Sequence, residues 1–223
     1  MTQAAKNPQQ DDAFSAMDRM YRIQRHFYDA TRKFYLLGRD KLITEIVRDP
    51  GSAILEVGCG TGRNLILLAK QKPAAECYGL DASSAMLETA RSNIERARLS
   101  NIILKTALAD EFGYLATFDR PEKFDVVFFS YSISMIPPWK ESIDNALANL
   151  KPGGKLYIVD FFDQKGLPAW FQEVLNWWLS KFHVKHWDGL IPYLESEEMQ
   201  KRCEVRITPL YRRYSFLAEL ELR

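Results

Sequence analysis

The chain has 223 residues, of which 47% are hydrophobic and 26% are charged, and its formal net charge is +1. This length and hydrophobic content predict one sizeable core, in one domain or in a domain with an appendage. The near-zero net charge excludes a general electrostatic attraction to nucleic acid, so no nucleic-acid partner is expected. The three cysteines form neither a metal-binding spacing nor an even disulfide framework, which indicates a reducing cytoplasm and no metal site.

Two further exclusions concern membranes and export. The N-terminal residues 1–14 are polar and lack the apolar core of a signal peptide. The longest uncharged run, residues 126–139, is shorter than the roughly 20 apolar residues that a spanning helix needs. We therefore expect a cytoplasmic protein that associates with a membrane only peripherally, if at all.

The first 48 residues differ in character from the rest of the chain. Residues 1–12 predict a disordered tail, and residues 14–48 carry helical patterning that is interrupted near Gly38. Between Arg19 and Lys41 the segment holds seven cations and two carboxylates, interleaved with aromatic rings. A solvated amphipathic helix would also carry such charges. We predict that residues 1–48 form a tail and an N-terminal helical lid over a core of residues 49–223.

The core alternates short apolar runs with amphipathic segments, which is typical of an α/β fold. The last two apolar runs flank a proline-containing loop and indicate an antiparallel pair. The prediction is a Rossmann-like, doubly wound seven-stranded sheet with a helical insertion at about residues 165–200. The expected strands are 53–57, 76–80, 101–105, 124–130, 155–161, 203–207 and 214–222, and the expected helices are 63–71, 84–98 and 139–150.

A glycine-rich turn, LEVGCGTG at residues 55–62, follows the first expected strand and opens the first helix. Glycines in this position let the backbone bend sharply and approach a ligand closely. The spacing differs from the dinucleotide fingerprint, and Arg63 stands where that fingerprint requires glycine or alanine. Because a bulky cation would obstruct close packing there, the turn argues against a nicotinamide cofactor. A tight turn without any ligand is the alternative.

This turn and three later motifs resemble those of the class I S-adenosylmethionine-dependent methyltransferases. The later motifs are Asp81 in YGLD, the Ala109–Asp110 pair, and LKPGGKLYIVD at residues 150–160. The resemblance implies S-adenosylmethionine as cofactor and S-adenosylhomocysteine as product. It implies that Asp81 accepts both ribose hydroxyls, that Asp110 recognises the adenine amino group, and that Met86 packs against the adenine. The cofactor-binding residues implied are Tyr28, Glu56, Gly58, Cys59, Gly60, Gly62, Asp81, Ala82, Met86, Ala109, Asp110 and Ser130.

The resemblance also implies that the segment after the fourth strand, SYSISMIPPW at residues 130–139, lines the acceptor site. Methyl transfer depends on alignment and water exclusion more than on acid–base groups, so no catalytic triad is expected. Related enzymes that methylate the exocyclic amines of nucleobases usually carry Asn/Asp-Pro-Pro-Tyr/Phe directly after this strand. Here Pro137 and Pro138 lie further along and follow Ile136, so this lack of resemblance argues against a nucleobase acceptor. Ser130, Tyr131, Ser134 and Met135 would form a mildly polar wall, in which the face of Tyr131 could stabilise a cationic nitrogen.

The cationic N-terminal segment suggests the charge of the substrate. Its FYD sequence resembles a Tyr-Asp element of lipid-quinone methyltransferases, which makes Tyr28 a candidate for the methionine end of the cofactor. Tyr28 and Tyr131 are the predicted catalytic residues. Arginine commonly binds a carboxylate through two parallel hydrogen bonds. A substrate with a carboxylate beside its amine would therefore account for the positive charge of this segment. The predicted substrate-binding residues are Arg25, Arg32, Lys33, Tyr35, Tyr131 and Met135.

Residues 167–184 predict a tryptophan-rich helix with a narrow polar stripe. Burial in the core would explain it, and so would a position at a lipid–water interface, because tryptophan and lysine are typical of such helices. Both alternatives stay open.

Three segments, residues 21–40, 130–137 and 159–184, resemble the bacterial betaine-lipid N-methyltransferases. This resemblance implies three successive transfers to the amine of diacylglyceryl-homoserine at a membrane surface, with the enzyme that makes the homoserine lipid as a possible partner. A methyltransferase for a quinone or a soluble small molecule is one alternative. A non-catalytic binding module is the other.

Overall fold

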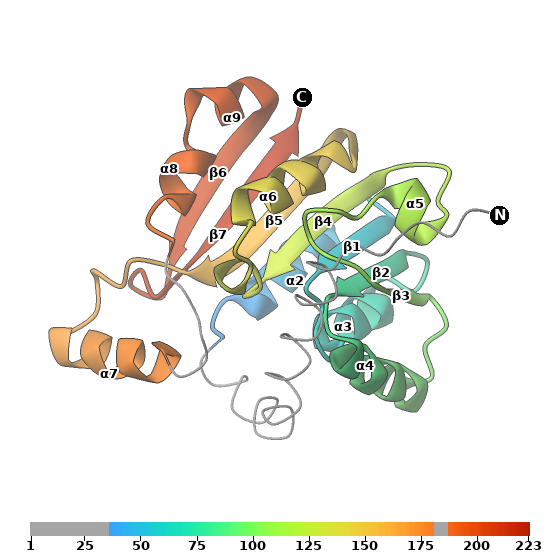
Figure 1. The fold of residues 1–223 in the computed structure, drawn as a ribbon, viewed down its shortest axis with the longest axis horizontal. Helices are drawn as coiled ribbons and strands as arrows, with labels where there is room; N and C mark the ends of the chain where they lie inside the picture. The colour runs from blue at the N-terminus through green and yellow to red at the C-terminus, as the bar shows by residue number, and fades with distance from the viewer. Residues whose placement is uncertain (1–35, 181–186) are drawn as a thin grey trace, which may run out of the picture.

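The computed structural model describes residues 36–180 and 187–223 (Figure 1). The predicted tail and most of the predicted lid lie outside the described residues. So do the N-terminal candidates for the site, namely Arg25, Tyr28, Arg32, Lys33 and Tyr35.

A seven-stranded sheet in the order β3-β2-β1-β4-β5-β7-β6 forms the centre of the molecule (Figure 1). The first five of these strands run parallel, and β7 pairs antiparallel with both β5 and β6. The predicted α/β class, seven strands and C-terminal antiparallel pair are confirmed. The strands are β1 (Ala53–Val57), β2 (Glu76–Asp81), β3 (Ile102–Thr106), β4 (Phe124–Ser130), β5 (Leu150–Phe161), β6 (Cys203–Leu210) and β7 (Ser215–Leu222).

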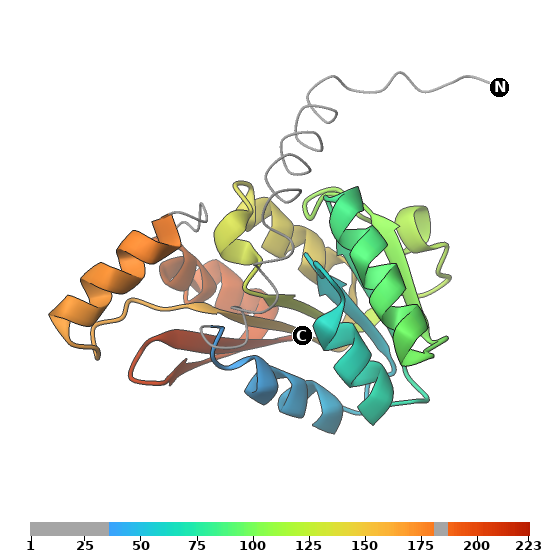
Figure 2. The same ribbon diagram turned by 90° about the horizontal axis from the view of Figure 1, so that it is seen from below.

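Helices cover both faces of this sheet (Figure 2). The apolar side chains of α2 (Arg39–Arg48), α3 (Arg63–Gln71) and Leu87 of α4 (Ser84–Ala97) join one buried cluster, which includes Val126 and Phe128 of β4. The opposite cluster contains α5 (Tyr114–Phe118) and α6 (Trp139–Ala148) together with Val127 and Phe129. Because β4 is buried on both faces, its residues 126–129 form a continuous apolar run, as expected for a central parallel strand.

Two predicted boundaries are wrong, and both involve proline. The turn expected at residues 152–154 lies inside β5, which begins at Leu150 and shifts register against β4 between Phe124 and Val126. Pro209, expected in a loop, belongs to β6. Strand β6 is at the edge of the sheet, where a residue without a backbone N–H is tolerated.

Between β5 and β6 the chain forms α7 (Ala169–Ser180), α8 (Leu190–Leu194) and α9 (Glu197–Arg202). Helix α7 projects at one side of the molecule (Figure 1). Within residues 36–180 and 187–223, no helix is long and apolar enough to cross a bilayer.

Candidate active site

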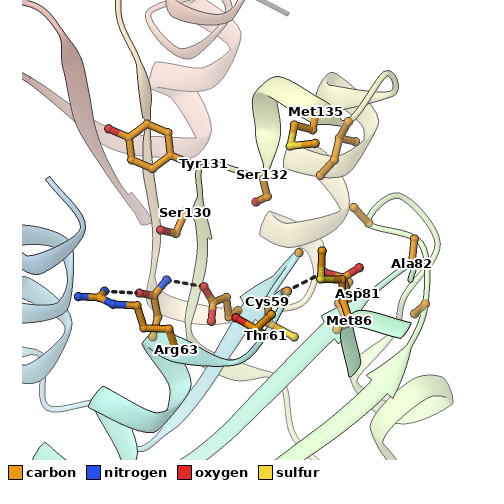
Figure 3. A pocket seen from close by; sticks show the side chains of 18 of the residues that line it. Cys59, Thr61, Arg63, Asp81, Ala82, Met86, Ser130, Tyr131, Ser132 and Met135 are labelled. Carbon is orange, nitrogen blue, oxygen red and sulfur yellow. Dashed lines mark hydrogen bonds between the residues drawn. The ribbon is translucent and has the colours of Figure 1, made fainter. Parts of the chain in front are cut away.

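A cavity of about 960 Å³ opens at the carboxyl ends of the parallel strands (Figure 3). Its lining includes residues that directly follow β1, β2, β3 and β4, and residues from the first turns of α2 and α3. The strand order reverses between β1 and β4, and ligands of open α/β sheets bind beside such a reversal. The volume is at the upper end of the range for small-molecule sites, so it can hold a cofactor and part of a second molecule.

The glycine turn after β1 forms one wall of this cavity. Gly58, Gly60 and Gly62 have φ angles of 74°, 53° and 78°, which side-chain-bearing residues rarely adopt. A Cβ atom at Gly58 would lie 2.6 Å from Cβ of Ser132. The alternating glycines therefore let the chain turn from β1 into α3 while it lies directly against the segment after β4.

Gly62, the third glycine predicted to bind the cofactor, packs against another helix. It does not belong to the lining that the described residues form, although Gly58, Cys59 and Gly60 do. A Cβ atom at Gly62 would lie 3.2 Å from Cβ of Ala90. Gly62 therefore allows close packing of α3 on α4, which is the role that the dinucleotide fingerprint would give to position 63.

Replacing Gly62 with alanine is expected to lower the free energy of unfolding by roughly 2–4 kcal/mol, from the left-handed backbone and the crowding against Ala90. Gly153 is the matched control, because its φ is 74° but nothing lies within 4 Å of the place that a Cβ atom would take there. Gly153→Ala should cost about 1–2 kcal/mol. Urea unfolding of both variants measures the difference, and equal costs would show that the α3–α4 contact is not tight.

Asp81 ends β2 and faces the cavity (Figure 3). Its Oδ2 accepts a hydrogen bond from the backbone N–H of Gly60 at 2.8 Å, and its Oδ1 accepts one from Ser83 at 2.9 Å. The carbonyl of Leu80 accepts from both Gly58 and Cys59 at 2.9 Å. These bonds hold the glycine turn to the end of β2. A carboxylate oxygen accepts hydrogen bonds only, so hydroxyl groups of a ligand are suitable donors to Asp81.

The segment after β3 closes the same end of the cavity. Ala109 and Asp110 line it together with Ala82 and Met86. The amide of Asn145 on α6 donates to the carbonyls of Ala109 at 3.2 Å and Phe112 at 3.0 Å, which fixes this segment. Sequence reasoning missed Asn145, because a single polar residue on an amphipathic helix gives no signal of its partner.

A polar chain links α2, α3 and β1 beneath the glycine turn. The amide of Asn64 donates to Oε1 of the buried Glu56 at 2.7 Å. Arg63 donates to Asn64 at 3.2 Å and forms an ion pair with Asp40 at 3.0 Å. Glu56, Arg63 and Asn64 all line the cavity. The sequence analysis used Arg63 only as an argument against a nicotinamide cofactor, and it did not predict a role for Asn64.

Tyr131 follows β4 and contributes to the opposite end of the cavity. Its hydroxyl donates to the carbonyl of Leu37, and its ring meets the edge of Phe161 at a centroid distance of 4.8 Å. In Figure 3 the hydroxyl points away from Asp81 and Met86. Burial raises the pKa of Tyr131 well above its usual value. The hydroxyl is therefore a tether for the N-terminal end of α2, and only the ring can face a substrate.

Asp160 fixes the rest of the segment after β4 through hydrogen bonds. This fully buried carboxylate at the end of β5 accepts from the backbone N–H of Ser134 at 3.0 Å and of Phe161 at 2.8 Å. Burial raises the pKa of Asp160 to about 6. Ser134 lies in the short helix η1 (Ile133–Met135), and the next residue, Met135, lines the cavity. Asp160 therefore positions the turn that carries Met135.

The structure brings most of the predicted site residues together. Ser134 is outside the lining. Pro137 and Pro138 are part of it, although the sequence analysis used them only as an argument against a nucleobase acceptor. The hydroxyl oxygen of Ser130 is buried and has no hydrogen-bond partner within the described part of the chain. The predicted residues that line the cavity are Glu56, Gly58, Cys59, Gly60, Asp81, Ala82, Met86, Ala109, Asp110, Ser130, Tyr131 and Met135.

Among residues 36–180 and 187–223, no group of three histidine, cysteine, aspartate or glutamate side chains could hold a metal ion. The titratable groups of the lining in this part of the chain are carboxylates, arginines, Cys59 and Tyr131. Burial, with the charges of Asp81 and Glu56, raises the pKa of Cys59 well above its usual value. The Cys59 thiol is therefore neutral and unreactive.

Comparison with known proteins agrees with this geometry. The family model described as a methyltransferase domain matches residues 48–202. A demethylmenaquinone methyltransferase of Listeria welshimeri is 30% identical over 123 residues, which are 55% of this chain and 50% of that protein. A malonyl-[acyl-carrier protein] O-methyltransferase of Priestia megaterium is 27% identical over 176 residues, 76% of this chain and 58% of that protein. The chain thus spans about half the length of these curated relatives.

A solved structure supports the fold assignment. Magnesium protoporphyrin IX methyltransferase of Synechocystis, determined with bound S-adenosylhomocysteine, superimposes with a TM-score of 0.63 at 17% identity, over 94% of this chain and 99% of that one. The family match covers more than half of the chain and includes the glycine turn, Asp81 and the segments after β3 and β4. The chain therefore belongs to the methyltransferase-domain family.

Proposed function

We propose that this chain trimethylates the amine of diacylglyceryl-homoserine, in the synthesis of a betaine lipid. The cofactor would lie along the glycine turn, with its ribose hydroxyls at Asp81, its adenine against Met86 and the adenine amino group at Asp110. The position of Asp81 supports this arrangement, because its buried carboxylate is a hydrogen-bond acceptor between the glycine turn and the end of β2. Tyr28 would close over the methionine end.

S-adenosylmethionine supplies an electrophilic methyl group when it is bound. The protein then needs to align a neutral amine and exclude water. Leu36, Ile136 and Pro137 make the acceptor end of the lining apolar, and such surroundings disfavour a charged ammonium ion before reaction. The ring of Tyr131 would stabilise the positive charge that forms on nitrogen. Arg25, Arg32, Lys33, Tyr35 and Met135 are proposed to contact the headgroup.

The observation that carries the lipid assignment is the exposed, tryptophan-bearing face of α7, which is apolar apart from Glu173. Trp170, Val174 and Trp177 are 67%, 57% and 61% exposed, and their spacing places them on one side of the helix. On the other side, Leu175 is buried in the same apolar cluster as Leu36 and Tyr131. Helix α7 therefore packs on the same apolar cluster as two residues of the cavity lining, while its opposite side is exposed. Tryptophans on an exposed helical face favour a lipid–water interface.

This surface predicts peripheral association with the cytoplasmic face of a membrane. The double variant Trp170→Gln and Trp177→Gln should lose at least about 10-fold in affinity for phospholipid vesicles, because each indole buries a large apolar area on insertion. Leu115→Gln is the matched control, since Leu115 is 58% exposed on α5, away from this surface. Vesicle co-sedimentation measures both. Equal vesicle binding by the wild type and the double variant would argue for a soluble acceptor.

The turnover test uses the full chain, S-adenosylmethionine and diacylglyceryl-homoserine in mixed vesicles. We expect mono-, di- and trimethylated lipid by mass spectrometry. Demethylmenaquinone is assayed in parallel, because the Listeria relative is named for that acceptor and a quinone is also apolar. Methylation of demethylmenaquinone alone would replace our proposal with the quinone alternative. Failure to bind S-adenosylhomocysteine in calorimetry would favour a non-catalytic module.

The biological setting is part of the same proposal. Diacylglyceryl-homoserine must be supplied by an enzyme that attaches a homoserine headgroup to a diacylglycerol lipid. We propose that enzyme as a partner, acting on the same membrane surface.

A further inference from the structure

We propose that the turn between β6 and β7, residues 211–213, binds the headgroups of anionic phospholipids beside the exposed face of α7. This inference deepens the proposed function, because it rests on the peripheral association with a membrane. It does not depend on diacylglyceryl-homoserine as the acceptor. The sequence analysis assigned no role to this turn.

Exposed apolar side chains gather at one end of the molecule. The described residues expose six large hydrophobic side chains, and four of these belong to α7 or to the turn. Besides Trp170, Val174 and Trp177 of α7, the fourth is Tyr211, which is 53% exposed. Figures 1 and 2 both place the turn and α7 at this end. Tyrosine, like tryptophan, combines an apolar ring with a polar edge and is enriched at the lipid–water interface.

The turn packs directly against the loop that leads into α7. The backbone N–H of Gln164 donates to the carbonyl of Arg213 at 2.9 Å, and a Cβ atom at Gly166 would lie 2.3 Å from the carbonyl oxygen of Arg212. The guanidinium of Arg213 donates to both carboxylate oxygens of Asp163, at 2.7 and 2.5 Å. These contacts fix the turn beside the first residues of α7, so the two elements form one surface.

The backbone of the turn adopts an unfavourable conformation. Tyr211, Arg212 and Arg213 have φ angles of 49°, 57° and 65°, a left-handed conformation that only glycine adopts without strain. Contacts within the protein explain Arg213, which pairs with Asp163 and lies 4.2 Å above the ring centroid of Phe162. Tyr211 and Arg212 are exposed, so packing does not explain large side chains at these two positions. Contact with a partner would explain them, because strained backbone is typical of binding sites.

The turn and the loop before α7 carry more cations than carboxylates. The cations are Lys165, Arg212 and Arg213, and the single carboxylate is Asp163, which pairs with Arg213 at 2.5 Å and with Lys165 at 3.7 Å. Arg212 is exposed and belongs to no ion pair among residues 36–180 and 187–223. Glu173 of α7 is exposed as well and offsets part of this charge. Cations beside exposed aromatic rings complement the surface of an anionic bilayer.

Vesicle binding tests this role of the turn without any methyl acceptor. Co-sedimentation compares vesicles of phosphatidylcholine with vesicles of equal parts phosphatidylcholine and phosphatidylglycerol, and the full chain should prefer the anionic vesicles. Arg212→Gln should lower the affinity for the anionic vesicles about 5-fold, the contribution of one cation near an anionic surface. Its affinity for phosphatidylcholine should stay unchanged. At high ionic strength the variant and the wild type should converge, because salt screens exposed charges.

Two further variants check that the effect comes from charge at this place. Glu173→Gln removes a carboxylate from the same surface, so it should raise the affinity for anionic vesicles by a similar factor. Arg98→Gln is the matched control, because Arg98 is also an exposed arginine with a left-handed backbone, at a φ of 55°. It follows α4, on the opposite side of the molecule from α7 (Figure 1). This control should bind both kinds of vesicle as the wild type does.

Three results would overturn the role of the turn. The first is an Arg212→Gln variant that matches the wild type on anionic vesicles, and the second is an equal loss in Arg98→Gln. In both cases the membrane association of the proposed function still stands, whereas a wild type that binds neither kind of vesicle would contradict both. The third result is a dimer in light scattering that Trp170→Gln with Trp177→Gln dissociates, because a second copy of the chain would then cover this surface.

Discussion

Replacing Asp81 with alanine is expected to weaken the binding of S-adenosylmethionine and S-adenosylhomocysteine by roughly 10- to 150-fold, because hydroxyl donors lose a charged acceptor. The same carboxylate accepts from Gly60 and Ser83. The variant should therefore also lose about 1–3 kcal/mol of folding free energy through unsatisfied backbone N–H groups. Calorimetry and urea unfolding measure the two effects separately.

A ligand change distinguishes direct recognition by Asp81 from an indirect loss of the glycine turn. An S-adenosylhomocysteine analogue without the two ribose hydroxyls should bind the wild type weakly. If Asp81 accepts those hydroxyls, this analogue should lose little further affinity in Asp81→Ala, giving a large coupling energy in the double-mutant cycle. If the analogue and the natural ligand lose affinity equally, Asp81 only shapes the turn and our placement of the ribose is wrong.

The second large effect concerns Asp160 and pH. Its pKa is raised by burial to about 6 in the folded protein, against about 3.9 in the unfolded chain. The folded state therefore binds this proton more tightly. The associated stability, about 3 kcal/mol, is fully present below the unfolded pKa and is lost as the pH rises through 6.

Asp160→Asn removes this titration while it keeps one acceptor for the N–H of Ser134 or Phe161. The free energy of unfolding of the wild type, minus that of the variant, should fall by about 3 kcal/mol between about pH 4 and pH 7.5. Taking the difference cancels the pH dependence that comes from groups shared by both proteins. Asp163 is one such group, because Arg213 lowers its pKa to about 2. A pH-independent difference would mean that Asp160 titrates normally.

The strands and the glycine turn after β1 could be predicted because their signals are local. A buried parallel strand carries a continuous apolar run, as residues 126–129 of β4 do, and a left-handed backbone favours glycine, as at Gly58 and Gly60. Asp81 was predicted from the resemblance of YGLD to a family motif, and the structure places it at the end of β2. Each of these inferences needs only a few consecutive residues and the alternation of strand and helix.

The roles of residues at the acceptor end could not be predicted in the same way, because these roles depend on contacts between distant parts of the chain. Nothing local distinguishes Arg39 from the other cations of residues 19–41; its burial follows from the contacts of Leu37 and Gly38 with β5, β6 and β7. Tyr131 was expected to present its ring to a substrate. The hydrogen bond of its hydroxyl could not be predicted, because its partner lies 94 residues away in sequence. The role of Gly62 depends likewise on Ala90 in another helix.

A crystal structure of the full chain with S-adenosylhomocysteine would test the proposed cofactor placement most directly. We expect the ribose at Asp81, the adenine beside Met86 and Asp110, and the sulfur directed toward Tyr131 and Met135, with open space beyond it for an amine. Density for the ligand outside this cavity, or a sulfur directed away from the segment after β4, would show that the methyl group cannot reach an acceptor held there.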